Sequence, residues 1–166
     1  EGEAKAILTR AAETKSERYE KLLLEGYPCY TTSVGWLGYS DDKLRDLCGE
    51  AQRKGFTHFK FKVGRNLESD IRRLSIARDV LGNTACLMID ANQVWEVQEA
   101  IDWVNNLNFA APFFIEEPTS PDDILGHKAI KQGVSPIKVA TGEMCQNRVI
   151  FKQLIAADAV DIVQID

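Results

Sequence analysis

The sequence predicts an α/β fold in which parallel strands alternate with helices. Short, nearly all-apolar segments, typical of strands covered on both faces, alternate with longer segments of helical periodicity, giving six strands with five helices between them. Parallel strands joined in this way take right-handed crossovers. Two architectures fit, an open doubly wound sheet and a β/α barrel. No G-x-G-x-x-G or Walker loop follows any strand, which weakens the nucleotide-binding form of the open sheet.

Composition narrows the functional class. The 166 residues suffice for one domain with a sizeable core, and 45% of them are hydrophobic. A net charge of -5 gives no sign of a basic nucleic-acid surface, and no apolar run is long enough to span a bilayer. The four cysteines form no C-x-x-C pair. We therefore expect reduced thiols in an intracellular protein rather than a disulfide framework or a zinc site.

The chain opens with a segment rich in Glu, Lys, Ala and Leu, and we expect one helix over residues 1–25. Gly26 and Pro28 end it. Glu1 stands where a complete protein would begin with methionine, and the last strand has no element after it. We therefore expect a fragment of a longer protein.

The first strand, residues 29–37, is rich in Thr, Val, Tyr and Trp. Ser40 then caps a helix whose apolar positions recur at i, i+3, i+4 and i+7, and Gly55 closes this helix. The second strand runs from 57 to 63. Trp36, in the first strand, is expected to be a core aromatic, with a place at the mouth of a pocket as the alternative.

From there a β/α unit recurs. Asn66 precedes a helix that Gly82 ends, and the apolar run 85–90 is the third strand. The helix expected at 96–107 carries its apolar residues on one side and leads to the fourth strand, 112–117.

The alternation continues to the end of the chain. Ser120 is expected to be an N-cap with Pro121 at the first helical position. The fifth strand is expected at 137–141, followed by a helix at 147–156 and a sixth strand at 160–166.

Two lysines lie inside the second strand, in the run Phe59-Lys60-Phe61-Lys62-Val63-Gly64. Residues two apart in a strand point to the same face, so Lys60 and Lys62 project side by side. Two ammonium groups on an inward face repel each other, which lowers the pKa of one of them. Such a lysine can act as a general base. The alternative is a solvated strand face, or an edge strand protected by lysine.

Acidic residues recur at the carboxyl ends of the later strands, where β/α barrels place catalytic groups. Their intervals approximate one β/α unit of roughly 30 residues. The strand-end acids are Asp90, Glu116, Glu143 and Asp166, with Asn92 and Glu117 close behind. Converging carboxylates require a cation, and hard oxygen ligands favour Mg²⁺ or Mn²⁺. Taken singly, each acid is better explained as an N-cap of the next helix, and the metal site is favoured only by the acids and the two lysines together. Glu117 is expected either to orient a lysine or Glu116, or to be a plain helix-entry acid.

A divalent cation beside a lysine base can hold a substrate carboxylate and stabilise the ene-diolate formed when the α-proton leaves. The chain resembles the enolase superfamily, in its mandelate-racemase-like branch, and within that branch the L-fuconate dehydratase group. The matching stretches are residues 30–42, 59–64, 88–93, 115–127, 140–143, 147–154 and 164–166. The lysine pair and the spaced carboxylates carry the superfamily resemblance, and the run 115–127 carries the narrower one.

The resemblance implies a small α+β capping domain over a (β/α)7β barrel. This chain would hold a partial barrel, about six strands and five helices of it, in residues 27–166, with residues 1–26 leading from a capping domain that is mostly absent. The resemblance implies Mg²⁺, with Mn²⁺ as the alternative, and a small-molecule acid sugar as substrate. It implies no nucleic-acid or membrane partner, and it is compatible with a homo-oligomer of the full-length protein. The implied location is mitochondrial if the resemblance to animal members holds, and cytoplasmic otherwise.

The resemblance also implies residue roles. Lys62 would take the α-proton, and Lys60 would contact the substrate carboxylate and depress the pKa of Lys62. The implied metal ligands are Asp90, Glu116 and Glu143, the implied substrate contacts are Lys60, Asn92 and Glu143, and Asp166 would orient a histidine of the next strand. That histidine protonates the departing 3-hydroxyl in the family. Neither His58, at the start of the lysine strand, nor His127, in a helix-forming segment, is assigned to this role.

The implied reaction is dehydration of L-fuconate to 2-keto-3-deoxy-L-fuconate, a hydro-lyase step in L-fucose degradation. Dehydration of another acid sugar and racemisation within the same branch are the alternatives, and a truncated chain with a binding or regulatory role is a further one. We expect the fragment alone to be inactive and prone to aggregation, because an open arc exposes sheet edges and an apolar interior.

Overall fold

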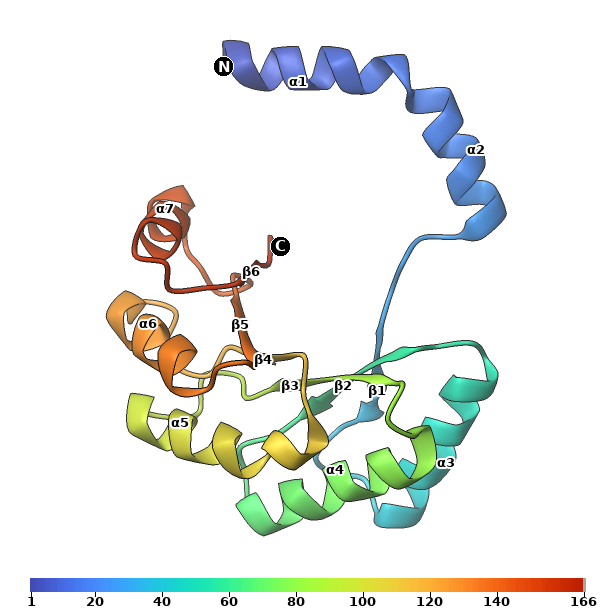
Figure 1. Cartoon of the computed structure of the whole chain (residues 1–166). Coiled ribbons are helices and arrows are strands. Elements are labelled where there is room, and N and C mark those ends of the chain that lie inside the picture. The colour runs from blue at the N-terminus through green and yellow to red at the C-terminus, as the bar shows by residue number, and fades with distance from the viewer. Residues whose placement is uncertain (166) are drawn as a thin grey trace.

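Six parallel strands lie side by side in chain order within residues 1–165, the part of the chain that the computed structural model describes (Figure 1). The strands are β1 Thr31–Gly35, β2 His58–Lys62, β3 Cys86–Asp90, β4 Phe114–Glu116, β5 Lys138–Thr141 and β6 Ile162–Val163. A doubly wound sheet reverses its strand order at a switch point. The consecutive order found here is that of a β/α barrel, of which the chain forms an arc. The predicted α/β class and partial barrel are confirmed.

Helices connect the strands along one side of the arc (Figure 1). They are α3 Asp41–Arg53, α4 Leu67–Leu81, α5 Val97–Asn106, α6 Ile124–Gly133 and α7 Arg148–Ala156, with the short 3-10 helix η1 Asn108–Ala110 after α5. The side chains of Ser40, Asn66 and Asn147 cap α3, α4 and α7. The cap at Ser40 is the one that the sequence analysis predicts. Within the described residues, every helix is too short or too polar to cross a membrane.

The first 25 residues form two helices rather than the single predicted one. α1 Gly2–Glu13 and α2 Lys15–Glu25 meet at Thr14, whose backbone leaves the helical region at φ -104 and ψ 14. Neither helix has a buried residue, and Figure 1 shows both standing away from the sheet. Helices are held mainly by packing of an apolar face, and a β-branched residue lowers helix propensity. Together these effects explain a break at Thr14.

The sixth helix begins later than predicted. Ser120 and Pro121 lie in a turn, and α6 starts only at Ile124. Asp123 is the N-cap, because its side chain accepts a 2.7 Å hydrogen bond from the Gly126 backbone N–H. The Ser-Pro pair resembles a helix start, but the aspartate three residues later provides the cap.

The two faces of the sheet differ in chemistry. Side chains such as Phe59, Phe61 and Leu87 are fully buried in the core beneath the helices. The residues between them point to the inner face of the arc, where Met88 and Phe114 belong to a second, smaller apolar cluster. Strand residues two apart point to the same face. Asp90 and Glu116 come two residues after Met88 and Phe114, so they lie on the same inner face, at the carboxyl ends of β3 and β4.

Candidate active site

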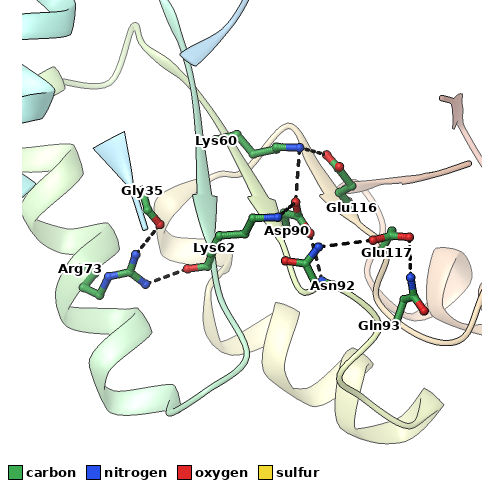
Figure 2. Close-up of polar contacts among 9 residues, drawn as sticks. All are labelled: Gly35, Lys60, Lys62, Arg73, Asp90, Asn92, Gln93, Glu116 and Glu117. Carbon is green, nitrogen blue, oxygen red and sulfur yellow. Dashed lines mark hydrogen bonds and ion pairs between the residues drawn. The ribbon is translucent and has the colours of Figure 1, made fainter. Parts of the chain in front are cut away.

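Two lysines and two carboxylates meet at the carboxyl ends of β2, β3 and β4 (Figure 2). Parallel pairing places Lys62 beside Asp90 and Asp90 beside Glu116. The Lys60 Nζ lies 2.6 Å from Glu116 Oε2 and 3.3 Å from Asp90 Oδ2. The Lys62 Nζ lies 2.6 Å from the same Asp90 oxygen. The predicted convergence of the lysine pair with these two acids is therefore present.

Burial separates the two lysines. The side chain of Lys60 is 7% exposed, whereas that of Lys62 is 33% exposed. The side chains of Asp90 and Glu116 are each 1% exposed. Buried charges need partners, and here two positive and two negative groups compensate each other. Lys62 is therefore the more solvent-accessible of the two lysines.

The electrostatics of Lys60 differ from the repulsion that the sequence suggested. Burial lowers its pKa, but the hydrogen bond and charge of Glu116, together with the charge of Asp90, raise it further, so the net pKa lies above its ordinary value. The carboxylates therefore keep the proton on Lys60.

Glu116 carries an unfilled acceptor. Burial raises the pKa of this carboxyl group, and the charge of Asp90 raises it too, against the hydrogen bond from Lys60. Its Oε1 atom is buried and has no hydrogen-bond partner in the structure. A buried carboxylate oxygen without a partner is costly, and added positive charge there would be stabilising.

These features fit a hard divalent cation in donor type. Asp90 and Glu116 offer oxygen atoms, which Mg²⁺ prefers. Glu143, in the turn after β5, is exposed, although its charge is near enough to raise the pKa of Glu117. Among residues 1–165, no three His, Cys, Asp or Glu side chains are grouped as a metal site. The structure thus joins Asp90 and Glu116 through Lys60 and leaves Glu143 outside this cluster.

Asn92 and Glu117 lie beside the cluster, on an unusual backbone. Asn92, Gln93 and Glu117 have positive φ angles of 48, 66 and 46 degrees, a region that costs non-glycine residues roughly 1–2 kcal/mol each. The Glu117 carboxylate accepts from Gln93 Nε2 at 2.8 Å and from Asn92 Nδ2 at 3.5 Å. The Asn92 backbone N–H donates to Asp90 Oδ1 at 3.0 Å. Glu117 therefore holds Asn92 and Gln93, rather than the lysine or Glu116 that the sequence analysis expected, and no helix begins at it.

Four residues that the sequence analysis considered lie outside this cluster. Asp166 lies outside the described residues. His58 begins β2, at the opposite end from Lys62, and His127 is buried in α6, so both lie where the sequence analysis expected them. Trp36, predicted to lie in the core, is 57% exposed, because it follows the end of β1 in a turn and stacks edge-on with Tyr39.

The sequence analysis missed two residues that the structure connects to the site. Gln93 supports Glu117, and the only sequence signal for it is its place in the Asn-Gln pair after a strand. Arg73, on α4, donates a 2.7 Å hydrogen bond to the backbone carbonyl of Lys62. Nothing in the helical pattern around Arg73 indicates this contact.

The sequence of this chain is similar to those of known proteins. Residues 43–166 match the family described as Enolase C-terminal domain-like. The human protein named Mitochondrial enolase superfamily member 1 is 52% identical over all of this chain, which covers 38% of that protein. The L-galactonate dehydratase of Hypocrea jecorina is 56% identical over 99% of this chain and 38% of its own length. The chain thus spans well under half the length of these relatives.

Solved structures agree in fold. The crystal structure of human Mitochondrial enolase superfamily member 1 superposes with a TM-score of 0.91 at 53% identity, covering 97% of this chain and 37% of the human chain. L-talarate/galactarate dehydratase from Salmonella typhimurium LT2, liganded with Mg and L-lyxarohydroxamate, gives a TM-score of 0.78 at 37% identity, over 83% of this chain and 35% of the other.

Proposed function

The chain belongs to the enolase superfamily, as part of its C-terminal domain, and from this premise we propose that it carries the base and part of the metal site of an Mg²⁺-dependent acid-sugar dehydratase. The observation that carries the proposal is the cluster at the ends of β2, β3 and β4, where a lysine with a one-third exposed side chain lies 2.6 Å from a buried carboxylate. Dehydratases of acid sugars are among the relatives.

Lys62 is the residue to which we assign proton removal. It takes the proton from C2 of the sugar acid, next to the carboxylate, and the C–H electron pair moves toward that carboxylate. The electrons then return to form the C2–C3 double bond as the 3-hydroxyl leaves, and the resulting enol becomes the 2-keto-3-deoxy acid. The departing hydroxyl needs a proton from an acid, and the described residues supply no assigned histidine for it.

The proposed ligands of the cation are Asp90, Glu116 and Glu143. A divalent cation held there would supply positive charge for the carboxylate oxygens that gain negative charge as the proton leaves. As ligands, Asp90 and Glu116 would no longer serve as anionic partners of the lysines, and the Lys62 amine would be released from its 2.6 Å contact with Asp90. The unpartnered Oε1 of Glu116 supports this assignment.

Lys60 and Asn92 are the proposed substrate contacts within this chain. The Lys60 ammonium group suits a contact to the substrate carboxylate, because a charge-assisted hydrogen bond between the two is strong. Asn92 is held by the Glu117 carboxylate and by its own backbone bond to Asp90, so its amide has a fixed direction. Fixed polar groups lower the entropic cost of orienting a substrate.

The proposed substrate is L-fuconate, with L-galactonate as the nearest alternative. L-fuconate is 6-deoxy-L-galactonate, so the two acids share the carboxylate, C2 and C3, and differ only at C6. A relative that is 56% identical is named for L-galactonate. The cluster described above acts on the shared end, and groups that meet C6 decide between the two acids.

The test is an assay of the purified protein that contains this chain, with a panel of acid sugars and detection of the 2-keto product. We expect turnover of L-fuconate or L-galactonate that EDTA abolishes, that Mg²⁺ restores, and that is lost in Lys62→Ala. Lys138→Ala is the matched control, because Lys138 begins β5 at the opposite end of the sheet and is exposed. Inversion of configuration at C2 without loss of water would show that the protein is a racemase and not a dehydratase. Binding of sugar acids without any turnover would favour a binding or regulatory role.

The cellular setting follows the relatives. The animal proteins are named mitochondrial, and we propose the same compartment, with the cytoplasm as the alternative. A homo-oligomer of the protein that contains this chain is proposed as well. Fractionation and light scattering test these two proposals.

A further inference from the structure

Arg73 is a buried arginine of α4 that reaches the ends of two strands. Its side chain is 3% exposed. Nη2 donates to the carbonyl of Gly35, the last residue of β1, at 2.7 Å. Nη1 donates to the carbonyl of Lys62, the last residue of β2, at 2.7 Å. Figure 2 shows the guanidinium between these two carbonyls.

Asp70 completes this device one helical turn earlier. Its side chain is 1% exposed. Oδ1 accepts from Arg73 Nη1 at 3.2 Å, and Oδ2 accepts from the Gly64 backbone N–H at 2.7 Å and from the Trp103 indole at 3.2 Å. The chain just beyond Lys62 is thus held at a carbonyl by Arg73 and at an N–H by Asp70.

The need for such a device follows from the lysine itself. Lys62 is the last residue of β2, its side chain is one-third exposed, and a lysine side chain has four rotatable bonds. The direction of the ammonium group therefore depends on how firmly the backbone of Lys62 is held. Main-chain pairing to β3 holds one side, through the Val63 N–H to the Asp90 carbonyl at 2.9 Å. The Arg73 fork holds the other side, toward β1.

We propose that Arg73, supported by Asp70, is a positioning residue that fixes the backbone of Lys62 and so keeps its amine directed at the reacting carbon. The inference rests on the proposed role of Lys62 as base. The planar guanidinium bonds two carbonyls and a carboxylate at once, which a lysine ammonium does not reproduce. Arg73 touches no substrate and acts through Lys62.

The same helix contains a matched control. Arg78 also donates to backbone carbonyls, to Ala85 at 2.8 Å and to Ala110 at 2.9 Å. These carbonyls lie before β3 and before β4, at the end of the sheet away from Lys62. Arg78→Met removes comparable hydrogen bonds to backbone carbonyls far from Lys62, so it measures the effect on folding of losing such bonds in general.

The first experiment is independent of catalysis. Amide hydrogen exchange of the protein that contains this chain is followed in peptides covering residues 58–66, for Arg73→Met and for Arg78→Met. We expect faster exchange at Val63 and Gly64 in Arg73→Met, and unchanged exchange there in Arg78→Met. Equal exchange in the two variants would overturn the clamp, whatever the enzyme's activity.

The second experiment measures turnover per folded protein, with substrate carrying hydrogen or deuterium at C2. In Arg73→Met we expect kcat to fall on the order of 10²-fold, KM to stay nearly constant, and the deuterium isotope effect to be at least as large as in the parent. If a variant only contains less folded protein, its isotope effect equals that of the parent, and we expect this result for Arg78→Met. An Arg73 variant whose isotope effect falls toward one would contradict the positioning role.

Arg73→Lys serves if the methionine variant does not fold, because it keeps a charge opposite Asp70 but loses the fork. We expect it to retain folding and to show an intermediate fall in kcat. Parental kcat and isotope effect in Arg73→Lys would overturn the proposal. If the parent has no dehydratase activity, the proposed function fails, and the exchange experiment still decides the clamp.

Discussion

Replacement of Lys60 by methionine is the perturbation whose consequence the structure defines most sharply. Methionine retains the apolar stem and removes the ammonium group that bridges Asp90 and Glu116 at 3.3 and 2.6 Å. Both carboxylates are 99% enclosed, so solvent does not replace the lost charge. Removing one partner of a buried ion pair costs about 3–5 kcal/mol. We expect that loss in the free energy of unfolding, measured by urea denaturation in the presence of chelator.

Mg²⁺ is expected to reverse most of this loss. A ligand that binds only the folded state adds about 2.7 kcal/mol when its concentration is 100 times the dissociation constant. If Asp90 and Glu116 are metal ligands, the stability difference between the parent and Lys60→Met shrinks in Mg²⁺. Lys131→Met is the matched control, because Lys131 also bridges two aspartates, Asp158 and Asp161, at 2.7 and 3.1 Å, but at the surface. Solvent screens that pair, so little stability is lost.

Two results would refute this reasoning. A loss in Lys60→Met as small as that in Lys131→Met would show that the buried carboxylates do not need the lysine. A loss that Mg²⁺ leaves unchanged would show that the carboxylates do not bind the cation.

Three further predictions follow from the same contacts. His127 is fully buried, and burial lowers its pKa below the ordinary value of 6.5, so the unfolded chain binds the proton first as the pH falls. The free energy of unfolding should therefore decrease below about pH 6.5, by at most about 1.4 kcal/mol per pH unit. The urea midpoint of His127→Leu should lack that decrease. Asn147 accepts from the Val149 N–H at 2.9 Å, so Asn147→Ala should cost about 1 kcal/mol in the same assay and Asn147→Asp much less; equal losses would contradict the cap. Glu117→Ala releases the amides of its neighbours and should raise KM for the acid sugar with little change in Mg²⁺ affinity, as titration calorimetry would show; an unchanged KM would remove Asn92 from substrate contact.

The inner face of the sheet was predictable because it depends on short-range rules. The period of two in a strand places Lys60 and Lys62 on one face, and parallel pairing brings strand-end residues of neighbouring units together. Asp90 and Glu116 follow from these two rules alone. The α/β class follows from the strict alternation of elements, and the consecutive strand order distinguishes the barrel from the doubly wound sheet.

The remainder depended on tertiary contacts that no local pattern contains. The bond from Arg73 to the Gly35 carbonyl spans 38 residues, and the sign of the Lys60 pKa shift depends on which carboxylates its ammonium meets. The positive φ angles of Asn92 and Glu117 are set by bonds between two turns. Residues such as Thr14 were misjudged for the opposite reason, since helical composition extends across a point where no packing holds one helix together.

The most direct test of the central claim is NMR of the reaction in D₂O, with the protein that contains this chain, Mg²⁺ and L-fuconate or L-galactonate. Removal of the C2 proton by Lys62, loss of the 3-hydroxyl and ketonisation of the enol predict a 2-keto product with one solvent deuterium at C3, and none of this product from Lys62→Ala. Product formation by Lys62→Ala at the parental rate, or a product without deuterium at C3, would contradict the account.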